Sequence, residues 1–203
     1  MKVMGEYPSH FSRNNSGMDA VKDINDADLK RFPVEQVSWD HCQVFIERLN
    51  RREKETGWLY RLPKEAEWEY ACRGGPQSDG PEFDFYFAKP TNTPMPGQAN
   101  FKETGLNRTC KVGSYEVNAL GLHDMHGNVS EWCDDTDPAP DGSLQRVHRG
   151  GNFLTSSGWC RAADRGRLPP SDVGSSIGLR LARVPVGPAL ESGAKEKSFG
   201  ARP

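Results

Sequence analysis

The stretch that decides the fold reads Arg146-Val147-His148-Arg149-Gly150-Gly151-Asn152-Phe153 and continues through Trp159-Cys160-Arg161-Ala162-Ala163-Asp164-Arg165 to Ile177-Gly178-Leu179-Arg180-Leu181. Its arginines are candidates for binding an anionic ligand, because a guanidinium donates two parallel hydrogen bonds to a carboxylate or phosphate. Arginines in such a stretch more often fasten loops to acidic side chains. The arginines concerned are Arg149, Arg161, Arg165 and Arg180, and their candidate partners are Asp134, Asp135 and Asp164.

Composition indicates a globular protein of one domain. The chain has 203 residues, enough to bury a substantial core, and a formal net charge of −2. A charge this close to neutral argues against nucleic acid or a membrane surface as a partner. No apolar run is long enough to span a bilayer, and the first residues lack the basic head and apolar stretch of a signal peptide. A cytoplasmic location is therefore the default expectation.

Five cysteines are scattered along the chain, and none forms a Cys-x-x-Cys pair. An odd number of cysteines in a chain of this length argues against a disulfide framework. We therefore expect reduced thiols, most of them buried as small apolar side chains. They are Cys42, Cys72, Cys110, Cys133 and Cys160.

Two helices are predicted in the first part of the chain. Ser38 is a good N-cap, and apolar side chains follow it on one helical face until Gly57 ends the pattern. A second, shorter helix begins near Pro63 and ends at the glycine pair 74–75. The buried positions are Cys42, Phe45, Ile46 and Leu49 in the first helix, and Trp68, Ala71 and Cys72 in the second.

The remaining sequence indicates irregular structure, because its many glycines and prolines favour turns. Residues 1–31 are polar and show no clear period, and Ser16-Gly17, Asp23 and Asn25-Asp26 are interpreted as loop. Residues 80–118 and 134–142 are interpreted as long loops or short strands. Loops of this length inside one domain are usually functional or metal-bound. Residues 185–203 are predicted to form a disordered tail that follows a domain spanning residues 1–184.

Four blocks, in order along the chain, resemble the formylglycine-generating enzyme family, also called sulfatase-modifying factors. They are Met4-Gly5-Glu6-Tyr7-Pro8-Ser9-His10-Phe11; Pro33-Val34-Glu35-Gln36-Val37-Ser38-Trp39-Asp40 with Tyr60-Arg61-Leu62-Pro63-Lys64-Glu65-Ala66-Glu67-Trp68-Glu69-Tyr70-Ala71; Asn118-Ala119-Leu120-Gly121-Leu122-His123-Asp124-Met125-His126-Gly127-Asn128-Val129-Ser130-Glu131-Trp132; and the stretch 146–183. The resemblance implies an α+β fold of the C-type-lectin-like kind, with two main helices, short strands and long ordered loops. Family members also have strands before the first block, so we expect this chain to lack its N-terminal strands.

The resemblance also locates the family's chemistry. Active members carry Gly-Gly-Ser-x-x-Cys-x-x-x-x-Cys, and their two thiolates hold a copper ion that activates oxygen, which oxidises a substrate cysteine to formylglycine. Soft thiolates suit Cu(I). Anchored on Gly150-Gly151, the pattern places Thr155 at the first cysteine and Cys160 at the second. Anchored on residues 161–165, it implies a three-residue deletion, and Cys160 falls outside the second position. Neither alignment gives a cysteine pair, so copper is not expected, and Cys160 is only a weak catalytic candidate.

The resemblance also implies that the fourth block, which contains Trp159, forms part of the substrate groove in relatives. Ser130 stands where the family commonly has an aromatic residue, and Asn152 stands where it has a serine. The candidate groove residues are Ser130, Asn152, Thr155, Trp159 and Cys160.

A calcium site is implied at positions Asp124, Gly127, Val129 and Glu131. Two carboxylates and backbone carbonyls in one tight, glycine-containing loop offer the oxygen ligands that Ca²⁺ prefers. The alternative is that both carboxylates cap turns or pair with arginines. A second, weaker calcium match consists of Asn100, Phe101 and Leu106, and Thr104 stands where that site's carboxylate is expected.

Histidines and tryptophans have simpler interpretations. His123 and His126 lie three apart beside Cys133, which suggests zinc. Both histidines occupy family positions usually filled by aromatic or apolar residues, so we interpret them, like His10, as structural. Trp159 belongs to the groove, whereas the core is expected to be anchored by Trp39, Trp68 and Trp132.

Three functions are compatible with these residues. The first is a non-catalytic member of the family that binds or recognises a protein, peptide or small-molecule ligand, and we favour it because the cysteine pair is missing. The second is an oxidoreductase that converts a substrate cysteine to formylglycine. The third is an oxidoreductase on this fold that uses other residues. Incubation with copper(I), oxygen and a Cys-x-Pro-x-Arg peptide separates the first two.

Overall fold

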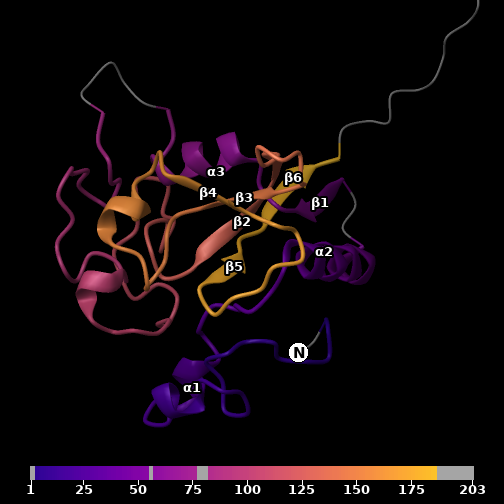
Figure 1. The fold of residues 1–203 in the computed structure, drawn as a ribbon, viewed down its shortest axis with the longest axis horizontal. Coiled ribbons are helices and arrows are strands. Elements are labelled where there is room, and N and C mark those ends of the chain that lie inside the picture. The colour runs from indigo at the N-terminus through magenta and orange to yellow at the C-terminus, as the bar shows by residue number, and fades with distance from the viewer. Residues whose placement is uncertain (1–2, 55–56, 77–81, 187–203) are drawn as a thin grey trace, which may run out of the picture.

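Helix α2, Trp39–Glu53, is the longest helix of the computed structural model, which describes residues 3–54, 57–76 and 82–186 (Figure 1). Ser38 caps it as predicted: the Ser38 Oγ accepts from the backbone N–H of His41 (3.0 Å), and His41 Nδ1 accepts from the N–H of Ser38 (3.3 Å). Cys42 and Ile46 are buried against Trp132. The helix ends at Lys54, which adopts a left-handed conformation (φ 44°).

Helix α3, Glu65–Cys72, is the predicted second helix. Its buried side chains, Trp68 and Cys72, are 1% and 0% exposed. The carboxylate of Glu67 accepts a hydrogen bond from the N–H of Lys64 (2.8 Å), which satisfies one of the free donors of the first turn. Both predicted helices are therefore confirmed, but their ends differ from the prediction: the last residue of α2 is Glu53, before the expected stop at Gly57, and Arg73 separates α3 from Gly74 and Gly75.

A four-stranded sheet lies between these helices. It is built from β2 (Ser130–Thr136), β3 (Arg146–Arg149), β4 (Arg165–Leu168) and β5 (Ile177–Leu179), in the spatial order β4-β3-β2-β5. The pairs β2–β3 and β3–β4 are antiparallel, and β2–β5 is parallel. Neighbouring side chains on β2 point to opposite faces. Accordingly Trp132 packs with α2, whereas Cys133 packs with Trp68 of α3.

A second, two-stranded sheet closes the other end of α2. Strands β1 (Trp58–Arg61) and β6 (Ala182–Pro185) are antiparallel, with Trp58 opposite Pro185. The side chain of Asn50, near the end of α2, binds both the N–H and the carbonyl of Tyr60 at 2.8 Å. These bonds tie α2 to β1.

The N-terminal segment is more regular than predicted. Residues 1–31, which show no clear period, contain a 3-10 helix, Met18–Val21, and the short helix α1, Asp26–Leu29. Asn25 caps α1, because its side chain accepts from the N–H of Asp28. Ser16, Gly17 and Asp23 lie in turns, as predicted, but the expectation of loop at Asp26 was wrong. Such short helices carry too few apolar positions to produce a visible period.

Glu35 fastens this segment to the sheet, a role that the sequence did not reveal. Its side chain is completely buried, and its two oxygens accept the N–H groups of His10 and Phe11, each at 3.0 Å. Burial raises the pKa of this carboxyl to about 7, although the two hydrogen bonds favour the ionised form. Glu35 also forms a bridge with Gly178 of β5.

The long connection from residue 82 to residue 129 is held by buried polar side chains. Asn128 Oδ1 accepts from the N–H of Cys110 (3.0 Å) and from Asn100 Nδ2 (3.2 Å). His126 Nδ1 donates to the carbonyl of Cys160 (2.7 Å), and its Nε2 accepts from the N–H of Tyr86 (2.9 Å). Satisfied backbone groups let an irregular segment lie in the interior. The architecture is α+β, with few helices and long ordered loops, as predicted.

The ends of the domain remain predictions. Most of the predicted tail, residues 187–203, lies outside the described residues. Among the described helices, none has both the length and the apolar composition needed to cross a bilayer.

Candidate functional site

The ends of β2, β3 and β4 and the turn at Gly150-Gly151 surround a cavity of about 110 Å³, which we call the groove pocket. Four of the five predicted groove residues line it, one from the start of β2 and three from residues 152–159: Ser130, Asn152, Thr155 and Trp159. The indole of Trp159 is 65% exposed at the pocket. The remaining lining residues are His148, Arg149, Gly150, Gly151, Asp164, Arg165 and Gly166.

Cys160, the fifth predicted groove residue, lies behind the pocket. It is 0% exposed, and burial raises the pKa of its thiol to about 11. Its Sγ is 3.5 Å from the Oγ1 of Thr155. A Cβ on Gly151 would lie 2.4 Å from the same sulfur, so only glycine leaves room for the thiol there. The hydroxyl of Thr155 and the thiol of Cys160, which the alignment anchored on Gly150-Gly151 assigns to the two cysteine positions, are therefore neighbours.

Ser130 and Asn152, which also depart from the family pattern, contact each other. Asn152 Nδ2 donates a hydrogen bond to Ser130 Oγ (3.0 Å), and both side chains are buried. The Oδ1 of Asn152 accepts from the N–H of Leu154 (3.0 Å). By the family pattern, the hydroxyl of Ser130 stands in place of an aromatic side chain, and the carboxamide of Asn152 stands in place of a serine. Together they give the pocket an uncharged polar wall.

His148 is a pocket residue that the sequence analysis missed. It lies on β3 opposite Trp132 of β2 and Gly166 of β4, and its ring meets that of Trp132 edge-on, with centroids 6.1 Å apart. Burial lowers its pKa to about 4, so the imidazole is neutral near pH 7. The strand alternation that places it beside Ser130 becomes apparent only when β2 and β3 are paired.

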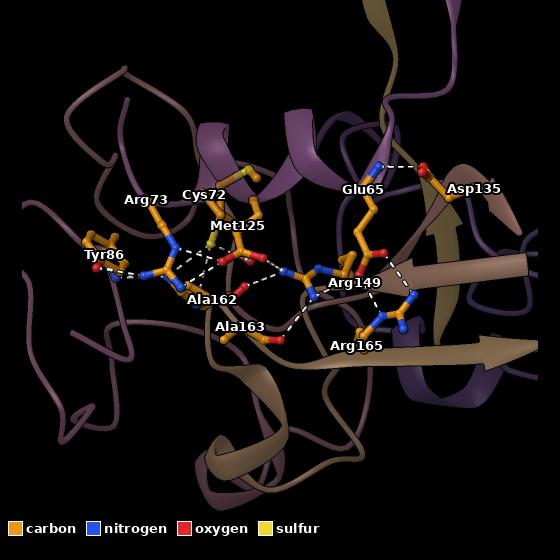
Figure 2. Close-up of polar contacts among 12 residues, drawn as sticks. Glu65, Cys72, Arg73, Tyr86, Met125, Asp135, Arg149, Ala162, Ala163 and Arg165 are labelled. Carbon is orange, nitrogen blue, oxygen red and sulfur yellow. Dashed lines mark hydrogen bonds and ion pairs between the residues drawn. The ribbon is translucent and has the colours of Figure 1, made fainter. Parts of the chain in front are cut away.

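Arg149 joins the elements that lie behind the groove pocket (Figure 2). Its guanidinium donates to Glu65 (3.2 Å) and Glu69 (2.5 Å) of α3, and to the carbonyls of Ala162 (2.6 Å) and Ala163 (3.1 Å). Its side chain is 1% exposed. One buried cation thus joins α3, β3 and the segment that leads into β4, and we call these three elements the frame of the groove.

The other arginines of the stretch also bind acidic side chains. Arg161 binds Asp164 (2.7 Å), which was among the candidate partners. Arg165 binds Glu65 (2.8 Å; Figure 2) and Asp137 (3.0 Å). Arg180 binds Glu131 (2.8 Å). Fastening of loops was therefore the better expectation, although most partners differ from those proposed.

All four predicted calcium positions line a second cavity, of about 620 Å³, between α2 and residues 179–181. Asp124 Oδ2 accepts from the N–H of Gly113 (2.8 Å), whereas Oδ1 is buried with no hydrogen-bond partner among the described residues. Burial raises the pKa of this carboxyl. A buried carboxylate oxygen without a partner is the kind of ligand that a hard cation takes, and Asp124 shares its cavity with Gly127 and Val129.

Glu131 is a less simple calcium ligand, because its carboxylate oxygens already accept hydrogen bonds from other side chains. Its oxygens accept from Arg180 Nε and Nη2, each at 2.8 Å, and from Trp68 Nε1 at 2.7 Å. A cation at this loop would share Glu131 with Arg180. Within the described ranges, no group of three or more His, Cys, Asp or Glu side chains is placed to hold a metal ion.

The second, weaker calcium match fits poorly. The hydroxyl of Thr104 lies 2.7 Å from the carbonyl oxygen of Phe101 and 3.2 Å from Asn100 Oδ1. Both expected ligand atoms are therefore engaged by this side chain. Leu106 lies in the same turn and is partly exposed.

The histidines once considered for zinc have other contacts. His126 is buried and bonded at both ring nitrogens, as described above, and burial lowers its pKa to about 4. The Nδ1 of His123 lies 2.8 Å from the carbonyl of Tyr115. All five cysteines are free and buried, as expected.

The chain matches the model of the sulfatase-modifying factor enzyme 1-like domain over residues 3–185. It belongs to this family. The chaperone protein LppX of Paenibacillus barcinonensis is 33% identical over 90% of this chain and 75% of that protein. The formylglycine-generating enzymes of Mus musculus and Streptomyces coelicolor are 30% and 32% identical over 74% of this chain, but the matches span only 44% and 52% of those enzymes.

Solved structures share the fold of this family member. Treponema denticola variable protein 1 superimposes with a TM-score of 0.68, at 24% identity, over 91% of this chain and 79% of that one. The structure of CarF gives a TM-score of 0.66, at 28% identity, over 79% of this chain and 70% of that one. The fold expected from the four sequence blocks is confirmed.

Proposed function

We propose that this chain is a binding module of the sulfatase-modifying factor family, which recognises a segment of polypeptide and does not generate formylglycine. The contact between Thr155 and Cys160 carries the proposal. Their Oγ1 and Sγ atoms lie 3.5 Å apart where active relatives, by sequence pattern, have two thiols. A hydroxyl and one buried thiol do not supply the two soft ligands that copper(I) requires, so the residues do not fit copper.

The form of the groove pocket supports a polypeptide as the ligand. A volume of about 110 Å³ is too small to enclose a ligand, so the ligand must lie across the surface and insert one group. Two exposed apolar side chains, Trp159 and Leu154, are available beside it, at 65% and 52% exposure. Exposed aromatic residues at a pocket are common anchors of recognition surfaces. The name of one relative, a chaperone protein, agrees with a polypeptide partner.

Formylglycine generation is the second candidate, because several relatives at about 30% identity bear that name. The chain spans about half the length of those enzymes, so their activity and substrates are not transferred to it by similarity alone. The same fold can carry unrelated functions, and the function depends on the site residues. Here the first thiol position is a threonine, which cannot take the thiolate's role.

We also propose that calcium binds the loop 124–131. The Asp124 Oδ1 atom and the backbone carbonyls of Gly127 and Val129 would hold it, and Glu131 would contribute while still paired with Arg180. Calcium would supply a fixed positive charge to a loop with little regular structure and would thereby stabilise the fold.

The decisive test offers the protein a Cys-x-Pro-x-Arg peptide with copper(I) under oxygen, and follows the mass of the peptide's cysteine. We expect no conversion, and conversion by the unaltered chain would overturn the proposal. Thr155→Cys places a second thiol beside Cys160, so this variant should bind copper(I) in competition with a chelator. Thr155→Ser is the matched control and should not.

A further inference from the structure

His148 is the pocket group whose hydrogen bonding the protein leaves open. Its ring lines the groove pocket, and its neighbours are the edge of Trp132 and the backbone of Gly166. A Cβ at position 166 would lie 2.3 Å from the imidazole Cε1, so the ring's position depends on glycine there. In the part of the chain that the structure describes, neither ring nitrogen has a hydrogen-bond partner.

The charged groups around the pocket, in contrast, are neutralised within the protein. Arg149 is bonded to Glu65 and Glu69, and Arg165 to Glu65 and Asp137. Asp164, the acidic lining residue, is bonded to Arg161. A charged ligand group would have to break one of these pairs. The other polar side chains of the lining are uncharged. Ser130, Asn152 and Thr155 are bonded to one another or to nearby backbone, whereas the imidazole has no hydrogen-bond partner among the described residues.

The size of the pocket narrows the ligand group further. Pockets for whole small molecules have volumes of about 300–1,000 Å³, so a cavity of about 110 Å³ receives only a part of a ligand. One side chain of a bound polypeptide is such a part. A neutral imidazole has one unprotonated nitrogen, which accepts a hydrogen bond. A small side chain that donates one therefore complements the pocket.

We propose that His148 is the specificity-determining residue of the groove pocket, and that it selects a small, uncharged hydrogen-bond donor (Ser, Thr, Asn or Gln) in a bound polypeptide. This inference rests on the proposed polypeptide-binding function. Trp159 packs against the residues that flank the inserted side chain. His148 accepts a hydrogen bond from the O–H or N–H group of the inserted side chain. Acidic, basic and large apolar side chains are rejected, because the first two lack a free counter-ion and the third leaves the imidazole unpaired.

The test is selection from a phage-displayed random heptapeptide library, followed by sequencing of the enriched pools. The baits are the unaltered protein, His148→Phe, His148→Leu, Trp159→Ala and, as a matched control on the other sheet, Trp58→Ala. Folding of each bait is checked by thermal melting. We expect enrichment of Ser, Thr, Asn or Gln at one position with the unaltered protein and with Trp58→Ala. We expect loss of that positional preference with both His148 variants, and loss of most binding with Trp159→Ala.

The enriched heptapeptide is then synthesised with and without alanine at the selected position. On the unaltered protein the alanine peptide should bind about fivefold to tenfold more weakly, as expected for one neutral hydrogen bond. On a His148 variant that folds, the two peptides should bind equally. If neither His148 variant folds, the enriched residue type in the unaltered protein's pool decides.

The outcomes separate the two proposals. If no peptide is enriched on the unaltered protein, the polypeptide-binding function fails, and this inference fails with it. If peptides are enriched but the selected residue is charged or apolar, the function stands and this inference is overturned. A polar preference that survives in a folded His148 variant also overturns it.

Discussion

The loop 124–131 and the groove segment 152–160 both follow the family's sequence pattern, but they keep different parts of it. In the loop the two carboxylates remain, and Glu131 also binds Arg180 and Trp68. In the groove, the alignment on Gly150-Gly151 places Thr155 where active relatives have the first thiol, and the buried Arg149 lies behind it.

The difference shows which functional residues a fold can lose. Glu131 is a candidate ligand that also holds the core together, so its loss would damage the fold. The groove's frame is held by Arg149, Glu65 and Glu69, none of which needs the cysteine pair. Chemistry can therefore disappear from the groove while its shape persists.

The largest loss of stability is expected when Arg149, the cation that holds the frame, is replaced. Arg149→Met leaves Glu65 and Glu69 without their buried cation and frees the carbonyls of Ala162 and Ala163. Removal of one partner from a buried charge network costs about 3–5 kcal/mol, so the free energy of unfolding in urea should fall by that amount.

The matched control for the frame is Arg161→Gln, which removes an exposed guanidinium from its pair with Asp164 and should cost far less, because exposed ion pairs contribute little to stability. Equal losses in the two variants would contradict the frame's role. The groove would then depend on its surface contacts as much as on Arg149.

The next effect concerns calcium at the loop. A ligand that binds only the folded state stabilises it by about 2.7 kcal/mol at a hundredfold excess over Kd. Thermal melts should therefore show a higher midpoint with calcium than with EDTA. Asp124→Asn removes the carboxylate whose Oδ1 has no partner, and it should abolish most of the difference.

Identical midpoints of the unaltered protein in calcium and EDTA would refute the calcium proposal. They would also sharpen the comparison between the two regions. Arg180 would then be the cation of the loop 124–131, and both regions would have kept the family's frame without its metal.

A smaller effect is expected at the pair formed by Ser130 and Asn152. Ser130→Ala removes the acceptor of a buried hydrogen bond of 3.0 Å and should cost about 1 kcal/mol. Ser114→Ala, which removes an exposed hydroxyl bonded to the carbonyl of Lys111, is the control and should cost less.

A double-mutant cycle with Asn152→Ala measures the coupling between the two side chains directly. The expected coupling is about 1 kcal/mol. Additive effects would mean that the hydrogen bond between Ser130 and Asn152 contributes no coupling energy.

Local signals in the sequence predicted the two main helices well. Ser38 and the apolar spacing after it define α2 through interactions within a few residues, so the sequence carries them directly. The groove residues were found through the family pattern, and four of the five share one cavity.

What the sequence missed depends on contacts between distant segments. The partners of Arg149 lie 80 and 84 residues away, and Glu35 binds backbone 24 and 25 residues away. His148 reaches the pocket only through the pairing of three strands. Such contacts leave no periodic trace in the chain, because they are set by how the elements pack.

Alkylation of the folded protein with iodoacetamide, followed by mass spectrometry of each cysteine, tests most directly whether the groove has lost its redox chemistry. A reactive thiolate needs exposure and a lowered pKa, whereas Cys160 is 0% exposed and its pKa is raised to about 11. We predict that Cys160 is labelled no faster than Cys42, Cys72, Cys110 and Cys133, and that all five react only on unfolding. Fast, selective labelling of Cys160 in the folded protein would contradict the conclusion that the groove is a binding site without a nucleophile.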